Sequence, residues 1–146
     1  MSVKVFADTN LLVYAFDTGQ PEKQRTAKRL IADYGNRSAL IVSTQVLQEF
    51  FVVTTRKLKQ PLSTELAGKA VEQFARYPLV QIDAHLILDS ITRHRDTGFS
   101  FWDCLIVEAA LSVGCDLLMS EDLHHDQQID GMRIINPFSE SDAVSF

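Results

Sequence analysis

Short apolar runs alternate with helix-length segments along this 146-residue chain, and this alternation constrains the fold more than any other feature. The first run, VKVFA, alternates in the manner of a β-strand, and ALIV at 39–42 is a second apolar run between polar residues. LVQID, DLLMS and MRIIN are similar short runs farther along the chain. The sequence therefore predicts about five short strands.

Helices are expected in the intervals between these runs. Pro21 is typical of a helix start and Gly35 of a helix end, and Ser100 and Gly114 frame a segment that is apolar almost all round. Alternating strands and helices predict a mostly parallel sheet covered on both faces, so the expected fold class is α/β, a three-layer α/β/α sandwich. The expected helices cover residues 21–35, about 44–60, about 63–77, about 84–95 and 100–114.

The composition fits one compact domain, because 46% hydrophobic and 23% charged residues are ordinary globular usage. We expect a single domain over 1–138 and a C-terminal tail over 139–146. No apolar stretch reaches the roughly 18 residues of a membrane span, and no secretion signal is present, so we expect a soluble, cytoplasmic protein with no membrane partner. Cys104 and Cys115 are not a C-x-x-C pair and are expected to be reduced core thiols.

Two acids directly follow predicted strands. Asp8 comes after the first strand, and Asp122 follows DLLMS, with the hydroxyl of Ser120 two residues before it. In an open parallel sheet, ligands bind beyond the carboxyl ends of the strands, so both acids are expected at the active edge. Either acid could instead simply cap a helix, because Asp favours the N-cap position.

Two further acids lie on predicted helices. Glu49 flanks a face that must turn inward, where an unpaired carboxylate is costly to bury, although it could swing out to solvent or pair with a Lys or Arg. Asp103 stands three residues after Ser100, which is the spacing of a capping box. Because its helix is expected to be buried, the first turn should also bring Asp103 close to Asp8 and Asp122.

If these carboxylates converge, they require a positive partner, because mutual repulsion would raise their pKa values and destabilise the fold. No Lys or Arg occupies the predicted strand ends, whereas carboxylate oxygens hold hard divalent cations such as Mg²⁺. The chemistry expected of such a site is phosphodiester hydrolysis. The expected ligands, for one or two ions, are Asp8, Glu49, Asp103 and Asp122.

The formal charge of -5 argues against a basic, salt-driven nucleic-acid binder. Two divalent cations would add four positive charges and bring this value to -1, so that a phosphate backbone could approach. The metal hypothesis therefore also accounts for the excess of acid.

Five segments carry these acids with their surroundings: FADTNLLVYAFD, STQVLQEFF, SFWDCLIVEAA, SEDLHHDQQIDG and RIINPF. With the acids in this order and at these separations, the sequence resembles the PIN-domain nucleases over nearly its whole length. It is most similar to the small VapC-like toxins of bacterial toxin–antitoxin pairs.

The resemblance implies a PIN-like fold and a Mg²⁺- or Mn²⁺-dependent endoribonuclease that acts as a toxin on an RNA substrate. It also implies a homodimer that is held inactive by a small antitoxin protein, a segment of which enters the acidic groove. By the same resemblance, Ser120 supports the site, and Asn10 orients Asp8 or a bound water.

Several other polar residues have plainer explanations. The adjacent His124 and His125 are expected at the surface, because hard oxygen sites have little need of imidazole. Asp126, where relatives of this type often have Gly, could be an extra outer ligand or a helix-surface acid, and we expect the latter. Asp83, after the third strand, and Glu108, inside the apolar helix, are expected to lie outside the metal shell.

Basic and aromatic residues could contact RNA, but both kinds have structural alternatives. A short basic run is usually a solvated helix end, and aromatic residues beside a buried helix are more often core or dimer surface. The aromatic candidates for stacking are Phe99, Phe101 and Trp102. The basic candidates for binding phosphates are Arg56, Lys57, Lys59, Arg93 and Arg95.

Three other functions fit the sequence less well. A non-catalytic PIN-fold regulatory or RNA-binding domain would keep the fold without cutting, and the full set of acids argues against it. A phosphatase with an aspartyl nucleophile typically has a D-x-D pair after the first strand, where this chain has Asn10 in the second place. A receiver-type signalling domain would need a Lys after its last strand, and this chain has none there.

Overall fold

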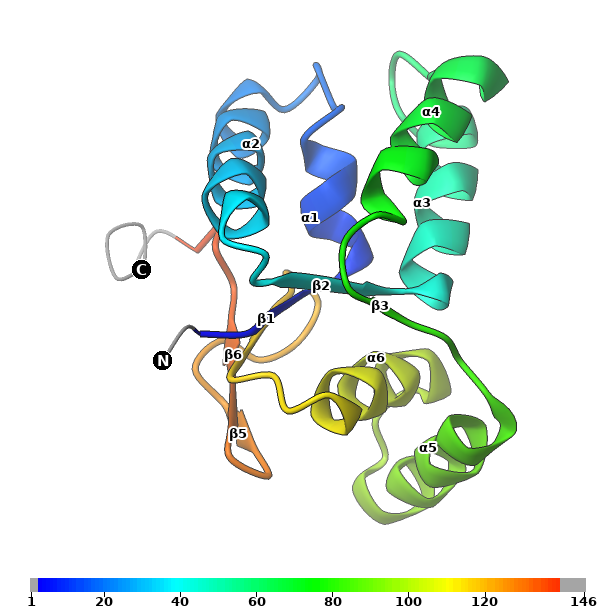
Figure 1. Ribbon diagram of the computed structural model, residues 1–146, viewed down its shortest axis with the longest axis vertical. Coiled ribbons are helices and arrows are strands. Elements are labelled where there is room, and N and C mark those ends of the chain that lie inside the picture. Colours follow the sequence, from blue (N-terminus) through cyan, green and yellow to red (C-terminus); the bar gives the residue numbers. More distant parts are fainter. Residues whose placement is uncertain (1–2, 140–146) are drawn as a thin grey trace.

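The computed structural model describes residues 3–139, which form a three-layer α/β arrangement (Figure 1). Its strands are β1 (Val5–Ala7), β2 (Leu40–Ser43), β3 (Leu79–Val80), β4 (Leu117–Met119), β5 (Gln128–Ile129) and β6 (Met132–Ile135). Its helices are α1 (Thr9–Tyr14), α2 (Pro21–Asn36), α3 (Thr44–Arg56), α4 (Thr64–Phe74), α5 (Ala84–Thr97) and α6 (Phe101–Ser112).

The strands form one sheet in the order β3-β2-β1-β4-β6-β5, and every neighbouring pair is parallel except β5 with β6. The central strand β1 is paired with β2 on one side and β4 on the other. Ala7 lies opposite Met119, so the residues that follow, Asp8 and Ser120, leave the sheet side by side. The carboxyl ends of β1, β2 and β4 therefore meet at one edge.

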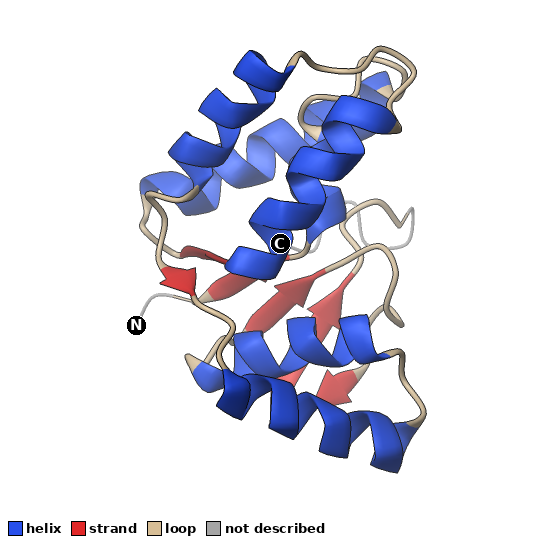
Figure 2. Ribbon diagram, turned by 90° about the vertical axis from the view of Figure 1, so that its right-hand side faces the viewer, coloured by secondary structure: helices blue, strands red, loops and turns tan. Residues whose placement is uncertain are grey.

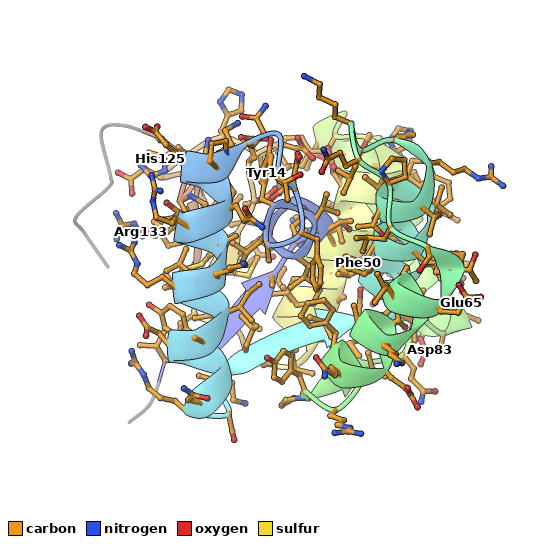
Figure 3. All side chains as sticks on the ribbon, turned by 90° about the horizontal axis from the view of Figure 1, so that it is seen from above. Tyr14, Phe50, Glu65, Asp83, His125 and Arg133 are labelled. Atoms are coloured by element: carbon orange, nitrogen blue, oxygen red, sulfur yellow. The ribbon has the colours of Figure 1, made fainter. Side chains whose placement is uncertain are left out.

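Helices cover both faces of the sheet, as expected for a mostly parallel sheet (Figure 2). The helices α1 to α4 lie on one face, and α5 and α6 lie on the other (Figures 1 and 2). Figure 3 shows the larger layer from above, with α1 end-on between α2 and α3. There Phe50 of α3 packs edge-on against Phe16 and Phe74, with ring centroids 5.5 and 5.3 Å apart.

The α/β class, the mostly parallel sheet and all five predicted helices are confirmed, while the ends and the number of elements differ. The helix expected to continue toward Pro61 ends at Arg56, and α5 extends beyond Arg95 until Gly98, whose φ of 76° ends it. The expected five strands become six in the described part, because β5 forms a hairpin with β6.

The cysteines, the hydropathy of the helices and the C-terminus complete the description of the fold. Cys104 and Cys115 are both buried and free of a disulfide. None of the helices within residues 3–139 has the length and hydropathy of a membrane-spanning segment. Apart from Ser139, the expected tail at 139–146 lies outside the described residues.

Candidate metal centre

Asp8 is positioned by both the helix that follows it and the neighbouring strand. As the N-cap of α1, it accepts a hydrogen bond at Oδ1 from the backbone N–H of Thr9 at 2.7 Å. Its Oδ2 accepts a hydrogen bond of 2.7 Å from the hydroxyl of Ser120, the residue after β4. Asp8 is only 5% exposed, and its bond with Ser120 is buried, whereas the bond with Thr9 is partly buried.

Burial raises the pKa of Asp8 to about 6. The hydrogen bonds from Ser120 and Thr9 lower this pKa, whereas the negative charges of Asp122 and Glu49 raise it further. At neutral pH, the folded protein therefore holds a buried carboxylate beside two acids of the same charge. A cation bound among them would relieve both the desolvation and the repulsion.

Asp122 is held at the same edge by Asn10 and Ser120. The side-chain amide of Asn10 donates to Oδ2 of Asp122 at 3.2 Å. Oδ1 of Asn10 accepts from the backbone N–H of Glu121, also at 3.2 Å. The backbone N–H of Asp122 donates to Oγ of Ser120 at 3.2 Å. Both predicted supporting residues therefore contact the acids, although the side chain of Asn10 bonds to the loop after β4 rather than to Asp8.

Glu49 projects from α3 toward α1 and is not extended into solvent. Its Oε1 accepts from the hydroxyl of Thr9 at 3.0 Å and, more weakly, from the side-chain amide of Gln45 at 3.4 Å. The amide of buried Gln45 also donates to the backbone carbonyl of Trp102 at 3.2 Å, which connects α3 to the first turn of α6. Thr9 and Gln45 are site residues that the sequence did not single out, although Gln45 stands one helical turn before Glu49.

Asp103 lies in the first turn of α6, as predicted. The N-cap residue Ser100 accepts a hydrogen bond from the backbone N–H of Asp103 at 3.1 Å, which is half of a capping box. The side chain of Asp103 lines the same cavity as Asp8, Glu49 and Asp122.

This cavity has a volume of about 360 Å³ and lies among α1, α3, the start of α6 and the loop after β4. Apolar side chains, including Val13, Val53 and Ile106, form part of its wall. Asp17, another residue not singled out from the sequence, also lines it and accepts at Oδ1 from the backbone N–H of Gly19 at 2.9 Å. Four predicted acids from four separate segments therefore share one cavity.

The residues fit a divalent cation by their chemistry. The atoms that could coordinate a metal are hard oxygens. One of them, Oε1 of Gln45, is the buried side-chain nitrogen or oxygen atom within residues 3–139 that lacks a hydrogen-bond partner. As they stand, however, no three His, Cys, Asp or Glu side chains in the described part of the chain are placed to hold a metal ion together. The site therefore has suitable ligands that are not yet gathered around one point.

The predicted basic contacts divide into two groups. Arg56 and Lys57 are exposed at the end of α3, and Lys59 is exposed in the segment that follows. Arg93 on α5 is instead engaged by Glu108 and by Asp130, the latter at 2.8 Å, while Arg95 bonds to the adjacent Asp96 at 2.9 Å. None of these five basic residues is among the described residues that line the cavity.

Three other polar residues singled out from the sequence have partners of their own and are not among the described residues that line the cavity. Asp126 lies in a turn rather than on a helix surface, and it is paired with Arg133 at 2.6 Å. Nδ1 of His125 accepts from the backbone N–H of Asn136 at 2.9 Å. Asp83 is the N-cap of α5 and accepts from the backbone N–H of Leu86 at 2.9 Å. Each of these groups has a structural role of its own.

Comparisons with known proteins agree with this architecture. The structure is similar to the sarcin–ricin loop cleaving toxin VapC20 of Mycobacterium tuberculosis, with a TM-score of 0.65, 20% identity and coverage of 82% of this chain and 90% of that one. A toxin–antitoxin complex from Klebsiella pneumoniae contains a chain with a TM-score of 0.69 and 15% identity, covering 92% and 98%. A chain of DNA-bound VapBC from Salmonella typhimurium has a TM-score of 0.63 and 19% identity, and the match covers 91% of this chain and 97% of that one.

At these identities, the structural likeness shows the fold. No curated protein sequence matches the chain. The sequence profile of the PIN domain matches residues 5–128, a span that begins in β1, ends at β5 and includes all four acids of the cavity. Since that profile covers most of the chain, this protein belongs to the PIN-domain family.

Proposed function

We propose that this protein is a Mg²⁺- or Mn²⁺-dependent endoribonuclease and the toxin of a toxin–antitoxin pair. The observation that carries the proposal is the meeting of four acids in one cavity, with Asp8 buried and its pKa raised to about 6. A metal bound there would supply hydroxide from water and stabilise the charge that develops at the phosphate. The residues that would hold one or two such ions are Asp8, Glu49, Asp103 and Asp122.

In this proposal, the neighbouring residues keep the carboxylates ionised and aimed into the cavity. The Ser120 hydroxyl and the backbone N–H of Thr9 each donate to Asp8, and this stabilises its charged form. Asn10 holds Asp122, and Thr9 donates its hydroxyl to Glu49. Divalent cations would also offset the formal charge of -5, which otherwise opposes the approach of RNA.

The partners follow from the same proposal. The similar structures include a toxin–antitoxin complex and a VapBC assembly bound to DNA, which supports a small antitoxin as the partner of this chain. From the family resemblance, we propose that a segment of that antitoxin inserts near the acidic cavity. We include a homodimer in the proposal on the strength of the family resemblance.

The experiment is cleavage of total RNA by the purified protein, freed of any bound antitoxin, with Mg²⁺, with Mn²⁺ and with EDTA. Asp8→Asn removes one proposed ligand, and Asp83→Asn is the matched control, because Asp83 also caps a helix through its side chain but is not among the described residues that line the cavity. We expect discrete fragments from the unmodified protein and Asp83→Asn with metal, and none from Asp8→Asn or with EDTA.

Cleavage that persists in EDTA or in Asp8→Asn would overturn the metal-dependent mechanism. A folded protein that binds RNA but cuts nothing under any of these conditions would instead favour a non-catalytic PIN-fold domain that regulates or binds RNA.

A further inference from the structure

Trp102 is an exposed aromatic residue at the candidate metal centre. Its side chain is 62% exposed, although a tryptophan normally buries most of its large apolar surface. It is followed directly by Asp103 and lines the same cavity as the four acids. Trp102 is also the only tryptophan of the whole chain.

The position of Trp102 is fixed on two sides. Its backbone carbonyl accepts a hydrogen bond of 3.2 Å from the side-chain amide of Gln45, which also donates to Glu49 at 3.4 Å. The indole packs against Phe101 in an edge-to-face arrangement, with ring centroids 5.3 Å apart and planes at 70°. An aromatic ring is therefore held in contact with solvent at a set place relative to the carboxylates.

We propose that Trp102 is a stacking platform for an unpaired base next to the phosphate that occupies the cavity. Base stacking on an aromatic side chain tolerates any base, because every base has a π-face. A base within a duplex already stacks on both of its neighbours, so it is not free to cover the indole. The substrate class is therefore RNA with single-stranded or looped segments, and this assignment rests on the proposed ribonuclease function.

The position of the tryptophan allows a direct test, because the intrinsic fluorescence of the protein at tryptophan wavelengths comes from Trp102 alone. The Asp8→Asn protein, which should not cut, is titrated with a short single-stranded RNA, with the same sequence in a duplex, and with an RNA that contains abasic sites. We expect the single strand to quench the fluorescence, and the duplex and the abasic RNA to quench it much less.

Substitutions measure the contribution of the ring to affinity. In the Asp8→Asn background, Trp102→Ala should weaken binding of the single strand about tenfold, and Trp102→Phe should retain most of the affinity. Leu88→Ala is the matched control, because Leu88 is also 62% exposed but lies on α5 and is not among the residues that line the cavity. It should bind as the unsubstituted background does.

The outcomes separate this inference from the proposed function. If the protein never cuts RNA but the single strand quenches Trp102 and Trp102→Ala weakens binding, the stacking platform stands and the nuclease proposal fails. If the protein cuts RNA but Trp102→Ala binds and cuts normally, or if the duplex quenches equally, the stacking platform is wrong. A change of oligomeric state in Trp102→Ala with unchanged RNA affinity would also overturn it, because the residue would then belong to a protein interface.

Discussion

At the scale of single residues, Asp8 does more than a helix cap requires. Asp83 caps α5 through the same kind of hydrogen bond to a backbone N–H, but its side chain remains exposed. Asp8 caps α1 while buried, beside Asp122 and Glu49, whose charges raise its pKa. Capping explains why an Asp is tolerated at this position, whereas the burial has no structural benefit of its own.

The raised pKa of Asp8 predicts a pH dependence of stability in the metal-free protein. The unfolded chain loses this proton near pH 3.8 and the folded protein near pH 6, so ionisation lowers the free energy of unfolding as the pH rises through this interval. The difference corresponds to about 3 kcal/mol; it begins as the pH rises through the unfolded-state pKa of 3.8 and is almost fully expressed above about pH 7. In denaturation experiments with EDTA present, we expect Asp8→Asn to be more stable than the unmodified protein at pH 8 and to differ little from it at pH 4.

A difference between the two proteins that stays constant from pH 4 to pH 8 would contradict this prediction. Asp8→Ala serves as a control for the cap, because it removes the hydrogen bond to the N–H of Thr9 and should lose about 1 kcal/mol relative to Asp8→Asn.

Ser120 gives a second prediction at this scale. Its hydroxyl donates to Asp8 and accepts from the backbone N–H of Asp122, so Ser120→Ala removes a bond that lowers the pKa of Asp8. We expect weaker Mn²⁺ binding by calorimetry at pH 7, with the loss becoming larger as the pH falls. Ser90→Ala is the control, since Ser90 is also fully buried but bonds to a carbonyl within α5. Equal metal affinity in both variants would contradict the role of Ser120.

At the scale of elements, α6 connects the core to the cavity. Its middle is buried on several sides, while its first turn presents Trp102 and Asp103 to the site. The N-cap residue Ser100 therefore orders a turn that both starts the helix and lines the cavity.

This arrangement predicts different effects for two equivalent caps. Ser100 and Ser63 each accept from a backbone N–H three residues later at 3.1 Å, at the starts of α6 and α4. Each Ser→Ala variant should lose about 1 kcal/mol of stability in chemical denaturation. Only Ser100→Ala should also weaken metal binding and RNA cleavage, because it loosens the turn that holds Asp103. The same functional loss in Ser63→Ala would show that global stability, rather than the position of Asp103, is responsible.

The elements that sequence reasoning missed are short ones. The helix α1 has 6 residues, and its LLVY stretch is as apolar as a strand, so periodicity does not distinguish the two. The strand β5 has 2 residues and no apolar run, and the signal that could have found it is the turn at Asp130 and Gly131, which both have positive φ. The observed end of α3 also differs from the predicted one. Pro61 sets only the latest point at which that helix could end, and α3 already ends at Arg56.

The site was predictable to the extent that its residues follow strands or caps. Asp8, Asp103 and Asp122 stand next to elements whose order places them at one edge of the sheet. Thr9 and Gln45 depend on contacts across 40 and 57 residues of sequence, and such contacts follow from packing rather than from a local pattern.

At the scale of the whole molecule, Arg93 joins three parts of the fold. From α5 its guanidinium binds Glu108 of α6 and Asp130 of the turn between β5 and β6, and the Arg93 side chain is only 17% exposed. Removing it leaves the largely buried Glu108 without its ionic partner.

We expect Arg93→Met to lower the free energy of unfolding by about 2 kcal/mol, measured with urea. Arg95→Met is the control, because Arg95 is exposed and bonds to its neighbour Asp96, and it should change stability little. If both variants unfold at the same urea concentration as the unmodified protein, the ion pairs of Arg93 do not hold these elements together.

The place of β1 in the middle of the sheet has a consequence for the synthesis of the protein. Its partner β4 is not complete until residue 119 has been translated, long after β1 itself. Asp8 and Asp122 therefore come together only after the helices between β1 and β4 have had time to form. A ribosome that makes this protein is accordingly not exposed to an assembled carboxylate site until both of these strands have been made.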